Sequence, residues 1–491
     1  MPWKDSESLP LHCIPLCELS SRVNLRGQLL QLEQKSLEAF LAAAKKLDAG
    51  FATLPDYHSR APAMQHLAEI LDATAERLHD NYPYFHPLYA GQMLKPPHPV
   101  ARLAYALAMW INPNNHAIDG GRATSTMEKE AVAEIAAMFG WKDFLGHLCG
   151  GGTMANLEAL WVAGQLQPGK KILASEQSHY THRRISSVLR LEFESVAADS
   201  QGRMDVDALE NRVRRGDVGT VVATMGTTAT GSVDPLPEIL ALRDRSGFHV
   251  HADAAYGGYF ELTQNLADHA KSAFARIAEA DSIVIDPHKH GLQPYGCGCV
   301  LFRDPGVGTL YKHDSPYTYF SSANLHLGEI SLECSRPGAA AAALWATQKL
   351  LPLIKGGEFA QGLERCRQAA LALHARLSAH DAFVPAFPPE LDIVVFAPRA
   401  STIPETSSLS RKIFTAAAAH GLHLALAELP VAFFPGLTPK LQIDQKDQKD
   451  HHTVTVLRSV LMKPEHLDWV DRIWEIIQSA TRQSSRTAAT P

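Results

Sequence analysis

Short apolar runs that alternate with helical stretches constrain the fold of this chain more than any other feature. From about residue 125 onward, short apolar runs lie at 171–174, 220–225, 249–252 and 282–285, and the last three are followed directly by Gly or Asp. Helical stretches such as 236–245 lie between them and serve as crossovers. This alternation predicts an α/β fold with a mostly parallel central sheet and right-handed crossovers, and therefore helices on both faces.

Helix boundaries are predicted from capping patterns. Ser125 is followed by Glu128 three residues later, which is a capping box that predicts a helix from there through Phe139. A second helix is expected over 157–166, directly after a glycine-rich segment.

The patterns divide the chain into three parts. Residues 1–110 contain amphipathic helical segments that cannot bury much apolar surface alone, so we expect them to pack on the main domain or on a second subunit. Residues 111–350 form the large domain. Residues 351–491 form a smaller α+β domain, with a helix over 358–379, strands near 391–396 and 453–461, and a final helix over 465–477.

Composition limits the classes of function. The 491 residues are 46% hydrophobic and carry a net charge of -6, which is typical of a soluble protein with more than one core and gives no basic excess for nucleic acid. No apolar stretch approaches the roughly 18 residues of a membrane span. The seven cysteines are odd in number and show no CxxC pair, so we expect reduced thiols and a cytoplasmic location.

Lys289 follows the run at 282–285 and precedes a turn rich in Pro and Gly. This placement puts an amine at the carboxyl end of a buried strand, where ligands bind in open α/β sheets. A lysine in a partly dry pocket can lose its proton and attack a carbonyl, so we expect Lys289 to form a Schiff base. Taken alone, the same lysine is more often a surface residue that caps a strand.

The segment Cys149-Gly150-Gly151-Gly152-Thr153-Met154-Ala155-Asn156 precedes the helix expected at 157–166. Glycines let backbone N–H groups converge on an anion, the helix amino terminus adds partial positive charge, and Thr153 offers a hydroxyl. The segment lacks the Gly-Lys-Ser/Thr of a nucleotide P-loop. It predicts a phosphate cradle, although a plain tight turn is also compatible with it.

Two further side chains suit a planar heteroaromatic ring. Asp253 ends the run at 249–252, and the small Ala254 and Ala255 beside it let a ring approach a carboxylate that could hold a proton on a ring nitrogen. His179 could lay its imidazole over the same ring. The alternatives are an aspartate that caps the next turn and an ordinary core or surface histidine.

A phosphate cradle, a stacking histidine, a strand-end Asp and a strand-end Lys are the four contacts that pyridoxal 5'-phosphate (PLP) needs. The chain resembles the group II PLP-dependent amino-acid decarboxylases of fold type I, which include glutamate, aromatic-amino-acid and archaeal tyrosine/aspartate decarboxylases. The matching motifs are the phosphate loop at Gly151–Leu160, the ring-nitrogen motif at Asp253–Gly258 and the Schiff-base motif at Asp286–Lys289.

This resemblance implies PLP as cofactor, an amino-acid substrate, and a homodimer with the active site at the subunit interface. It implies that Gly152 and Thr153 hold the phosphate and that His288 lies near it. It also implies that Thr224, at a strand end, faces the cofactor beside Ala255, and that Arg458 lies near the substrate carboxylate.

The substrate side is less defined. Animal decarboxylases carry a catalytic tyrosine in a mobile loop, but the corresponding segment 320–328 has no Tyr after Phe320, which leaves His326, Tyr317 and Tyr319 as proton donors. Gln92 matches a glutamine of glutamate decarboxylases, and His116 and Arg122 could line the same wall. An acidic and an aromatic substrate both remain open.

Three alternatives to the decarboxylase interpretation remain. One keeps the cofactor but makes the chain a carbon–carbon lyase or an aminotransferase on the same fold. Another is a non-enzymatic relative, which would need a decayed site. The third is metal binding by the His-x-His pairs at 249/251 and 288/290, but no carboxylate or thiolate recurs at ligand spacing, so we predict no metal site.

Overall fold

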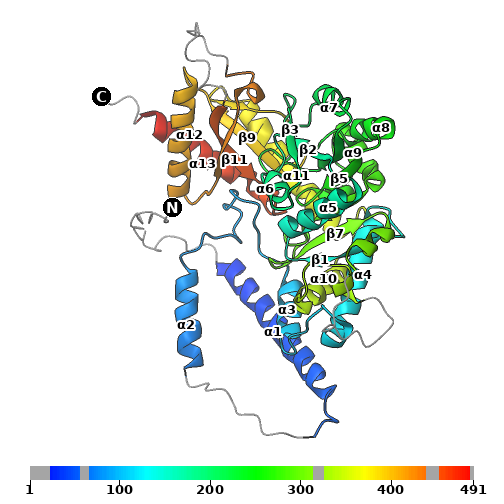
Figure 1. Ribbon diagram of the computed structural model, residues 1–491. Coiled ribbons are helices and arrows are strands. Elements are labelled where there is room, and N and C mark those ends of the chain that lie inside the picture. Colours follow the sequence, from blue (N-terminus) through cyan, green and yellow to red (C-terminus); the bar gives the residue numbers. More distant parts are fainter. Residues whose placement is uncertain (1–22, 56–65, 313–325, 438–452, 487–491) are drawn as a thin grey trace. The chain divides into compact units, whose positions relative to one another are not determined.

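The computed structural model describes residues 23–55, 66–312, 326–437 and 453–486, with the side chains of 23–33 excepted (Figure 1). The chain comprises two compact units, Met1–Arg60 and Ala61–Pro491. In the first unit, helix α1 spans Val23–Ala49. Every element discussed below belongs to the second unit.

The second unit alternates helices and strands along the chain. Its described α-helices are α2 (Leu67–Leu78), α3 (Pro99–Met109), α4 (Arg122–Met138), α5 (Gly152–Leu166), α6 (Thr181–Val188), α7 (Val206–Val213), α8 (Leu236–Ser246), α9 (Asp268–Ala275), α10 (Gly338–Leu350), α11 (Glu358–Ser378), α12 (Ile403–Ala419) and α13 (His466–Arg486). Its described strands are β1 (Leu145–Cys149), β2 (Lys171–Ser175), β3 (Phe193–Val196), β4 (Val218–Thr224), β5 (His249–Asp253), β6 (Ser282–Ile285), β7 (Gly298–Phe302), β8 (Phe383–Pro385), β9 (Ile393–Pro398), β10 (Ala425–Pro430) and β11 (Thr453–Val460).

The larger sheet has seven strands in the order β1-β7-β6-β5-β4-β2-β3. Strands β6, β5, β4, β2 and β3 are parallel, and β7 runs antiparallel to both of its neighbours. The predicted runs form β2, β4, β5 and β6, which confirms a mostly parallel sheet. The carboxyl ends of β4, β5 and β6 therefore meet at one edge of the sheet.

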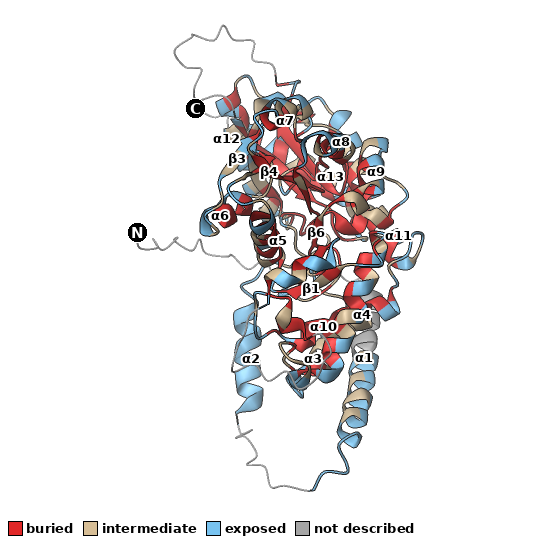
Figure 2. Ribbon diagram, turned by 45° about the vertical axis from the view of Figure 1, so that its right-hand side comes forward, coloured by how far each residue is buried: buried red, intermediate tan, exposed pale blue. Residues whose placement is uncertain are grey.

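Helices cover both faces of this sheet, as predicted. Along β4, Val221 and Ala223 share a core with residues of α8, whereas Val222 packs with residues of α5 and α6. Because successive side chains of a strand point to opposite faces, these two cores lie on opposite sides of the sheet. Figure 2 shows the buried strands between the two helix layers.

The smaller sheet has four antiparallel strands in the order β10-β11-β9-β8. Helices α11, α12 and α13 pack with it around a second core that includes Leu373, Phe396, Ile413 and Ile473. An α+β arrangement within residues 351–491 is thus present. The domain boundaries at 110 and 350 remain a prediction.

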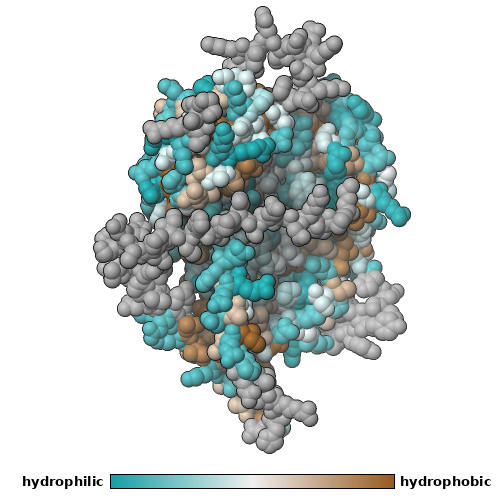
Figure 3. Space-filling model, turned by 90° about the vertical axis from the view of Figure 1, so that its left-hand side faces the viewer, coloured by the Kyte–Doolittle hydropathy of each residue, from teal (hydrophilic) through white to brown (hydrophobic). Residues whose placement is uncertain are grey.

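On the face shown in Figure 3, hydrophilic side chains cover most of the described surface. Among the described residues, no helix is long and apolar enough to cross a membrane.

The predicted start of the helix at Ser125 is wrong. Helix α4 begins at Arg122 with Gly121 as its N-cap, and the Ser125 N–H donates to the Gly121 carbonyl within the helix at 2.7 Å. Similarly, α5 begins at Gly152 and not at residue 157. Gly151 and Gly152 therefore form the amino terminus of α5 itself, which places the glycine segment at the positive end of a helix of 15 residues.

Candidate functional site

A pocket of about 490 Å³ lies where the carboxyl ends of β4 and β5 meet the loop after β6 and the amino terminus of α5. Its volume is within the range of cofactor sites. Its lining includes the residues predicted to contact the cofactor, namely Gly152, Thr153, His179, Thr224, Asp253, Ala255, His288 and Lys289. Residues separated by more than a hundred positions in the sequence thus converge on one pocket.

The glycine segment fits tightly against the loop after β6. Gly151 has φ +143°, a conformation that side chains rarely adopt, and a Cβ on it would lie 3.1 Å from His288 Cε1. A Cβ on Gly152 would lie 2.6 Å from Asp286 Oδ2. Since the first N–H groups of α5 have no partners within the helix, this close-packed terminus is suited to an anion.

Asp253 is fixed by two hydrogen bonds. His182 Nε2 lies 2.7 Å from Asp253 Oδ2, and the Ala255 N–H donates to Oδ1 at 3.2 Å. Burial by itself would raise the pKa of Asp253, but the hydrogen bond and charge of His182, with smaller contributions from His251 and Lys289, hold this pKa well below its usual range. The carboxylate is therefore ionised and can hold a proton at a ring nitrogen.

His179 precedes α6 and is half-buried in the pocket. Its Nδ1 lies 2.7 Å from Thr181 Oγ1, and the Thr181 N–H approaches the same nitrogen at 3.3 Å. Burial lowers the pKa of His179, with nearby Lys289 and His182 acting in the same direction against Asp253. A neutral, oriented imidazole is the form best suited to face a flat ring.

Lys289 pairs with Asp286, whose Oδ2 lies 3.0 Å from Nζ. Burial alone would lower the pKa of Lys289, but the charge and hydrogen bond of Asp286, helped by Asp253, outweigh burial and raise this pKa. The expectation that a dry pocket favours loss of the proton is therefore wrong for the pocket formed by these residues. The reason is the carboxylate three residues earlier in the same turn.

The remaining lining residues supply polar atoms that are free to bind a ligand. Thr224 Oγ1 and Asp286 Oδ1 are buried and have no hydrogen-bond partner among the described residues. His288 is oriented by the contact of its Nδ1 with the Cys297 carbonyl at 2.8 Å. An anion cradle, an ionised carboxylate, a neutral imidazole and an amine around one pocket fit PLP.

The predicted substrate residues lie beside this pocket or apart from it. Arg458, on β11, donates to the carbonyls of Ala229, Gly91 and Thr228 at 3.2, 3.1 and 2.7 Å. Thr228 lines the pocket, so Arg458 lies directly behind its wall. Gln92 follows Gly91 and is exposed.

His326, His116 and Arg122 do not line the pocket of their own chain. The Ile118 N–H donates to Nδ1 of the buried His326 at 3.0 Å, and the Gly328 N–H donates to the His116 carbonyl at 2.9 Å, so these two segments lie side by side. Arg122 is exposed at the start of α4. Tyr317 and Tyr319 lie outside the described residues.

Sequence reasoning missed the residues that support the pocket from behind. His182 contacts Asp253, while His251 Nε2 lies 2.8 Å from Asn156 Oδ1, and Asn156 Nδ2 donates to the Gly152 carbonyl at 2.8 Å. The available signal was spacing. His182 lies one helical turn after His179, and His251 shares a strand face with Asp253.

The His-x-His pairs do not form a metal site within the described residues, where no group of three or more His, Cys, Asp or Glu side chains has suitable geometry. His251 is turned inward to Asn156 and Ser282, and His290 Nε2 lies 3.2 Å from Asp392 Oδ2.

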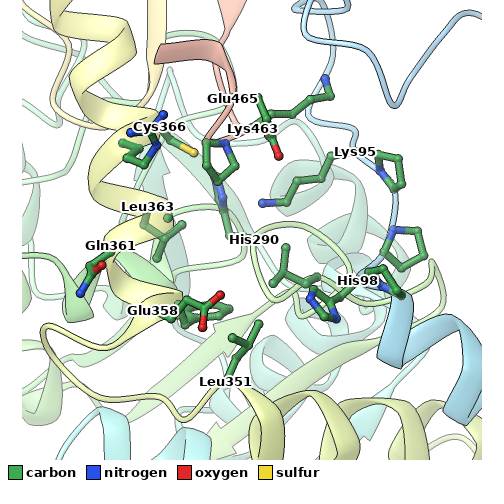
Figure 4. A pocket seen from close by; sticks show the side chains of 18 of the residues that line it. Lys95, His98, His290, Leu351, Glu358, Gln361, Leu363, Cys366, Lys463 and Glu465 are labelled. Carbon is green, nitrogen blue, oxygen red and sulfur yellow. The ribbon is translucent and has the colours of Figure 1, made fainter. Parts of the chain in front are cut away.

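A second pocket of about 510 Å³ shares no lining residue with the first. Figure 4 shows Lys95 extending into it from the chain before α3. Lys95 Nζ donates to the Met462 carbonyl at 3.1 Å, and Lys463 Nζ donates to the Tyr89 carbonyl at 2.7 Å. The two amines thus join two segments of the fold by reciprocal contacts with main-chain carbonyls.

Known proteins share both the sequence and the fold. The pyridoxal-dependent decarboxylase conserved domain matches residues 160–399. An L-tyrosine decarboxylase of Enterococcus faecium is 28% identical over 408 residues, which cover 62% of this chain and 66% of that protein. A probable L-tyrosine/L-aspartate decarboxylase of Methanothermobacter thermautotrophicus is 30% identical over 263 residues, which cover 53% of this chain and 70% of that protein. The chain thus spans just under two thirds of the Enterococcus relative.

Among solved structures, the Oryza sativa protein TDC, crystallised with PLP and tryptamine, superposes with a TM-score of 0.71 at 17% identity, covering 96% of this chain and 99% of that one. At this identity the likeness establishes the fold, which is that of the PLP-dependent enzymes of fold type I. Together with the matching domain and the Methanothermobacter relative, it places the chain: it belongs to the pyridoxal-dependent decarboxylase family, whose cofactor is PLP.

Proposed function

We propose that this chain converts an L-amino acid with an acidic or aromatic side chain to the corresponding amine and carbon dioxide. The observation that carries the proposal is the convergence of Lys289, Asp253 and His179 with the amino terminus of α5 on one pocket. Family membership supports the reaction. The relatives named for tyrosine and for tyrosine/aspartate support the two substrate classes.

In this proposal each end of the pocket has a separate task. The N–H groups of Gly152 and Thr153 hold the phosphate, with His288 beside them. At the other end, Asp253 holds a proton at the ring nitrogen. When bound, PLP supplies an aldehyde that condenses with amines and a protonated ring that accepts electrons as the substrate carboxylate leaves.

Three residues act between these ends. His179 covers one side of the ring, and the small side chain of Ala255 leaves room for it. The Thr224 hydroxyl, which lacks a partner among the described residues, donates to the ligand. Lys289 holds the cofactor through Nζ and yields that position to the substrate amine.

Substrate recognition is assigned to Arg458, behind the pocket wall, and to three residues outside the pocket lining. Arg458 uses three of its five N–H donors on carbonyls, which leaves donors for the substrate carboxylate. Gln92, His116 and Arg122 distinguish acidic from aromatic side chains. The proton that replaces the carboxylate comes from His326, Tyr317 or Tyr319.

We also propose that the active unit is a homodimer, with the pocket completed at the interface. Helix α2 supports this: Leu67, Ile70, Leu71 and Leu78 lie on one face of the helix at i, i+3, i+4 and i+11, and they are 44–63% exposed. A second subunit would cover this face. It would also supply residues that complete the pocket, which neither His326 nor His116 lines within its own chain.

A cytoplasmic location belongs to the same proposal. The described cysteines Cys149, Cys297, Cys299, Cys334 and Cys366 are free thiols. Free thiols are typical of a reducing compartment.

The test is an assay of the purified protein, loaded with PLP, against L-tyrosine, L-aspartate, L-glutamate and the other common amino acids. Stoichiometric carbon dioxide and amine are expected from an acidic or aromatic substrate. Formation of a 2-oxo acid would instead assign an aminotransferase, and an aldehyde released by cleavage of a carbon–carbon bond would assign a lyase.

Lys289→Ala is the decisive variant because it removes the only proposed nucleophile. We expect decarboxylation to fall by roughly a thousandfold or more, as is typical when a covalent catalyst is removed. Lys271→Ala, which removes an exposed lysine from α9, serves as the control and should retain full activity. Equal activity of the two variants would refute the assignment of Lys289.

A further inference from the structure

His182 lies behind the cofactor pocket, in the first turn of α6. Its side chain is fully buried, and its Nε2 lies 2.7 Å from Oδ2 of Asp253, whose side chain is 6% exposed. The two residues are 71 positions apart in the sequence. The contact therefore joins α6 to the end of β5 at the carboxylate that faces the pocket.

The surroundings of His182 determine which hydrogen-bonding role it has. Its second ring nitrogen, Nδ1, is buried and has no hydrogen-bond partner among the described residues. The ionised Asp253 carboxylate can only accept a hydrogen bond, so the His182 Nε2 carries a proton and donates to Oδ2.

This bond leaves the carboxylate both oriented and available. Oδ2 accepts from His182 and Oδ1 accepts from the Ala255 N–H, so rotation of the carboxylate would break both bonds. Each carboxylate oxygen can accept more than one hydrogen bond, so a further donor in the pocket can still be bound. His251 lies on β5 two residues before Asp253. It cannot replace His182 because its ring nitrogens contact Asn156 and Ser282.

The hydrogen bond between His182 and Asp253 also determines the charge of Asp253. Burial favours the protonated carboxyl, and the hydrogen bond from His182 is the largest influence that opposes burial. The other titratable groups that act on Asp253 are His251 on β5 and Lys289 after β6, and His179, which directly precedes α6, also interacts with Asp253. Removal of the His182 hydrogen bond therefore shifts Asp253 toward its neutral form, which cannot stabilise a proton on a ring nitrogen.

We propose that His182 is a positioning residue that keeps the Asp253 carboxylate ionised and aimed at the ring nitrogen of the cofactor. This inference rests on the role proposed above for Asp253. It adds a residue that touches neither cofactor nor substrate and acts through a single hydrogen bond.

The test compares His182→Leu with His182→Gln, since the glutamine amide can still donate to Asp253. PLP affinity and the absorption spectrum of the bound cofactor are measured without substrate from pH 5 to 9. We expect His182→Leu to bind PLP about tenfold to a hundredfold more weakly, the range for loss of a hydrogen bond to a charged group. We also expect the cofactor spectrum of His182→Leu to change with pH over a range in which the wild-type spectrum is constant. His182→Gln should restore much of the PLP affinity and much of the constancy of the spectrum.

His269→Leu is the matched control, because its half-buried ring lies away from the cofactor pocket and forms a hydrogen bond with the Val233 carbonyl. It should leave PLP affinity and spectrum unchanged. Thermal unfolding of each variant shows whether it folds. If His182→Leu does not fold, the PLP affinity and spectrum of His182→Gln are compared with those of wild type and of Asp253→Asn.

Wild-type affinity and an unchanged spectrum for folded His182→Leu would overturn the inference, as would a His182→Gln variant as impaired as His182→Leu. Failure of the proposed function looks different. In that case wild-type protein does not bind PLP, or Asp253→Asn binds it as well as wild type does.

Discussion

Gly152 shows how little space the site leaves at the level of a single residue. Its Cα faces Asp286, a residue that is 2% exposed and is held by Lys289. The same glycine supplies one of the N–H groups at the start of α5. The close approach of loop and helix therefore requires a residue without a side chain, and the anion cradle depends on that approach.

Gly152→Ala should weaken PLP binding by at least about tenfold, or roughly 1.4 kcal/mol. Its Cβ would lie 2.6 Å from Asp286 Oδ2, and the buried, ion-paired carboxylate cannot move away without breaking its contacts. The measurement is a fluorescence titration of the cofactor-free protein with PLP. Gly362→Ala in α11 is the control: its Cβ would meet nothing nearer than Pro464 Cγ at 3.4 Å, so affinity should be unchanged. Equal affinities would show that the loop relaxes freely.

The sequence predicted those residues lining the candidate pocket that lie at the end of an element, and it missed those defined by tertiary contacts. Lys289, Asp253 and the glycine segment follow directly from strand ends and a helix start, which local patterns reveal. His182 was missed because its partner is far away in the sequence. The ion pair of Lys289 was missed because the effect of Asp286 depends on the turn between them.

At the level of elements, composition decided what was predictable. Strands β4 and β6 are mostly β-branched, β2 and β5 each have one β-branched residue within a short run, and all four were predicted. Strands β1 and β7 contain Gly146 and Gly298 within Leu-Gly-His-Leu-Cys and Gly-Cys-Val-Leu-Phe, which do not carry a strong strand pattern. They form strands through sheet pairing: β7 pairs with β6 on one side and with β1 on the other.

The contact between residues 89–95 and 462–463 leads to a prediction on stability. Burial lowers the pKa of Lys463 to about 7, with repulsion from Lys95 acting in the same direction. In the unfolded chain this amine has its usual, higher pKa, so between about pH 7 and 10 the unfolded state binds more protons. The wild type should therefore gain stability relative to Lys463→Met as the pH rises through this window.

We expect the difference in free energy of unfolding between wild type and Lys463→Met to change by at least about 1 kcal/mol from pH 7 to pH 10. Urea unfolding of both proteins at the two pH values measures it. For Lys142→Met, at an exposed position, the free energy of unfolding should change with pH as it does for wild type. If the free energy of unfolding of Lys463→Met also changes with pH as that of wild type does, the Lys463 amine stays charged in the folded protein.

For the whole molecule, the exposed apolar face of α2 is the feature with the largest consequence. Within the described residues this helix buries none of its own side chains. Amphipathic helices gain most of their stability from packing an apolar face, so α2 alone is marginal. The proposed second subunit accounts both for this helix and for the predicted residues that lie apart from the pocket.

Replacing Ile70 and Leu71 together with Glu should convert a dimer to monomers, because two charges on the apolar face of α2 would be buried in the proposed interface. Light scattering coupled to gel filtration gives the mass of each form, with 53.6 kDa expected for the monomer. Ala73→Glu places a charge on the same helix away from the apolar face and should remain dimeric. A dimeric double variant would show that α2 is not part of the interface.

Strand β5 has one further consequence. It carries Asp253, at the proposed ring end of the pocket, and two residues earlier His251, which contacts Asn156 and through it the Gly152 carbonyl at the proposed anion-binding end. Because a strand rises about 3.3 Å per residue, the spacing of the two ends is built into a rigid stretch of backbone. The fixed spacing therefore selects ligands by length, and a vitamin B6 derivative that is too short or too long can contact one end only.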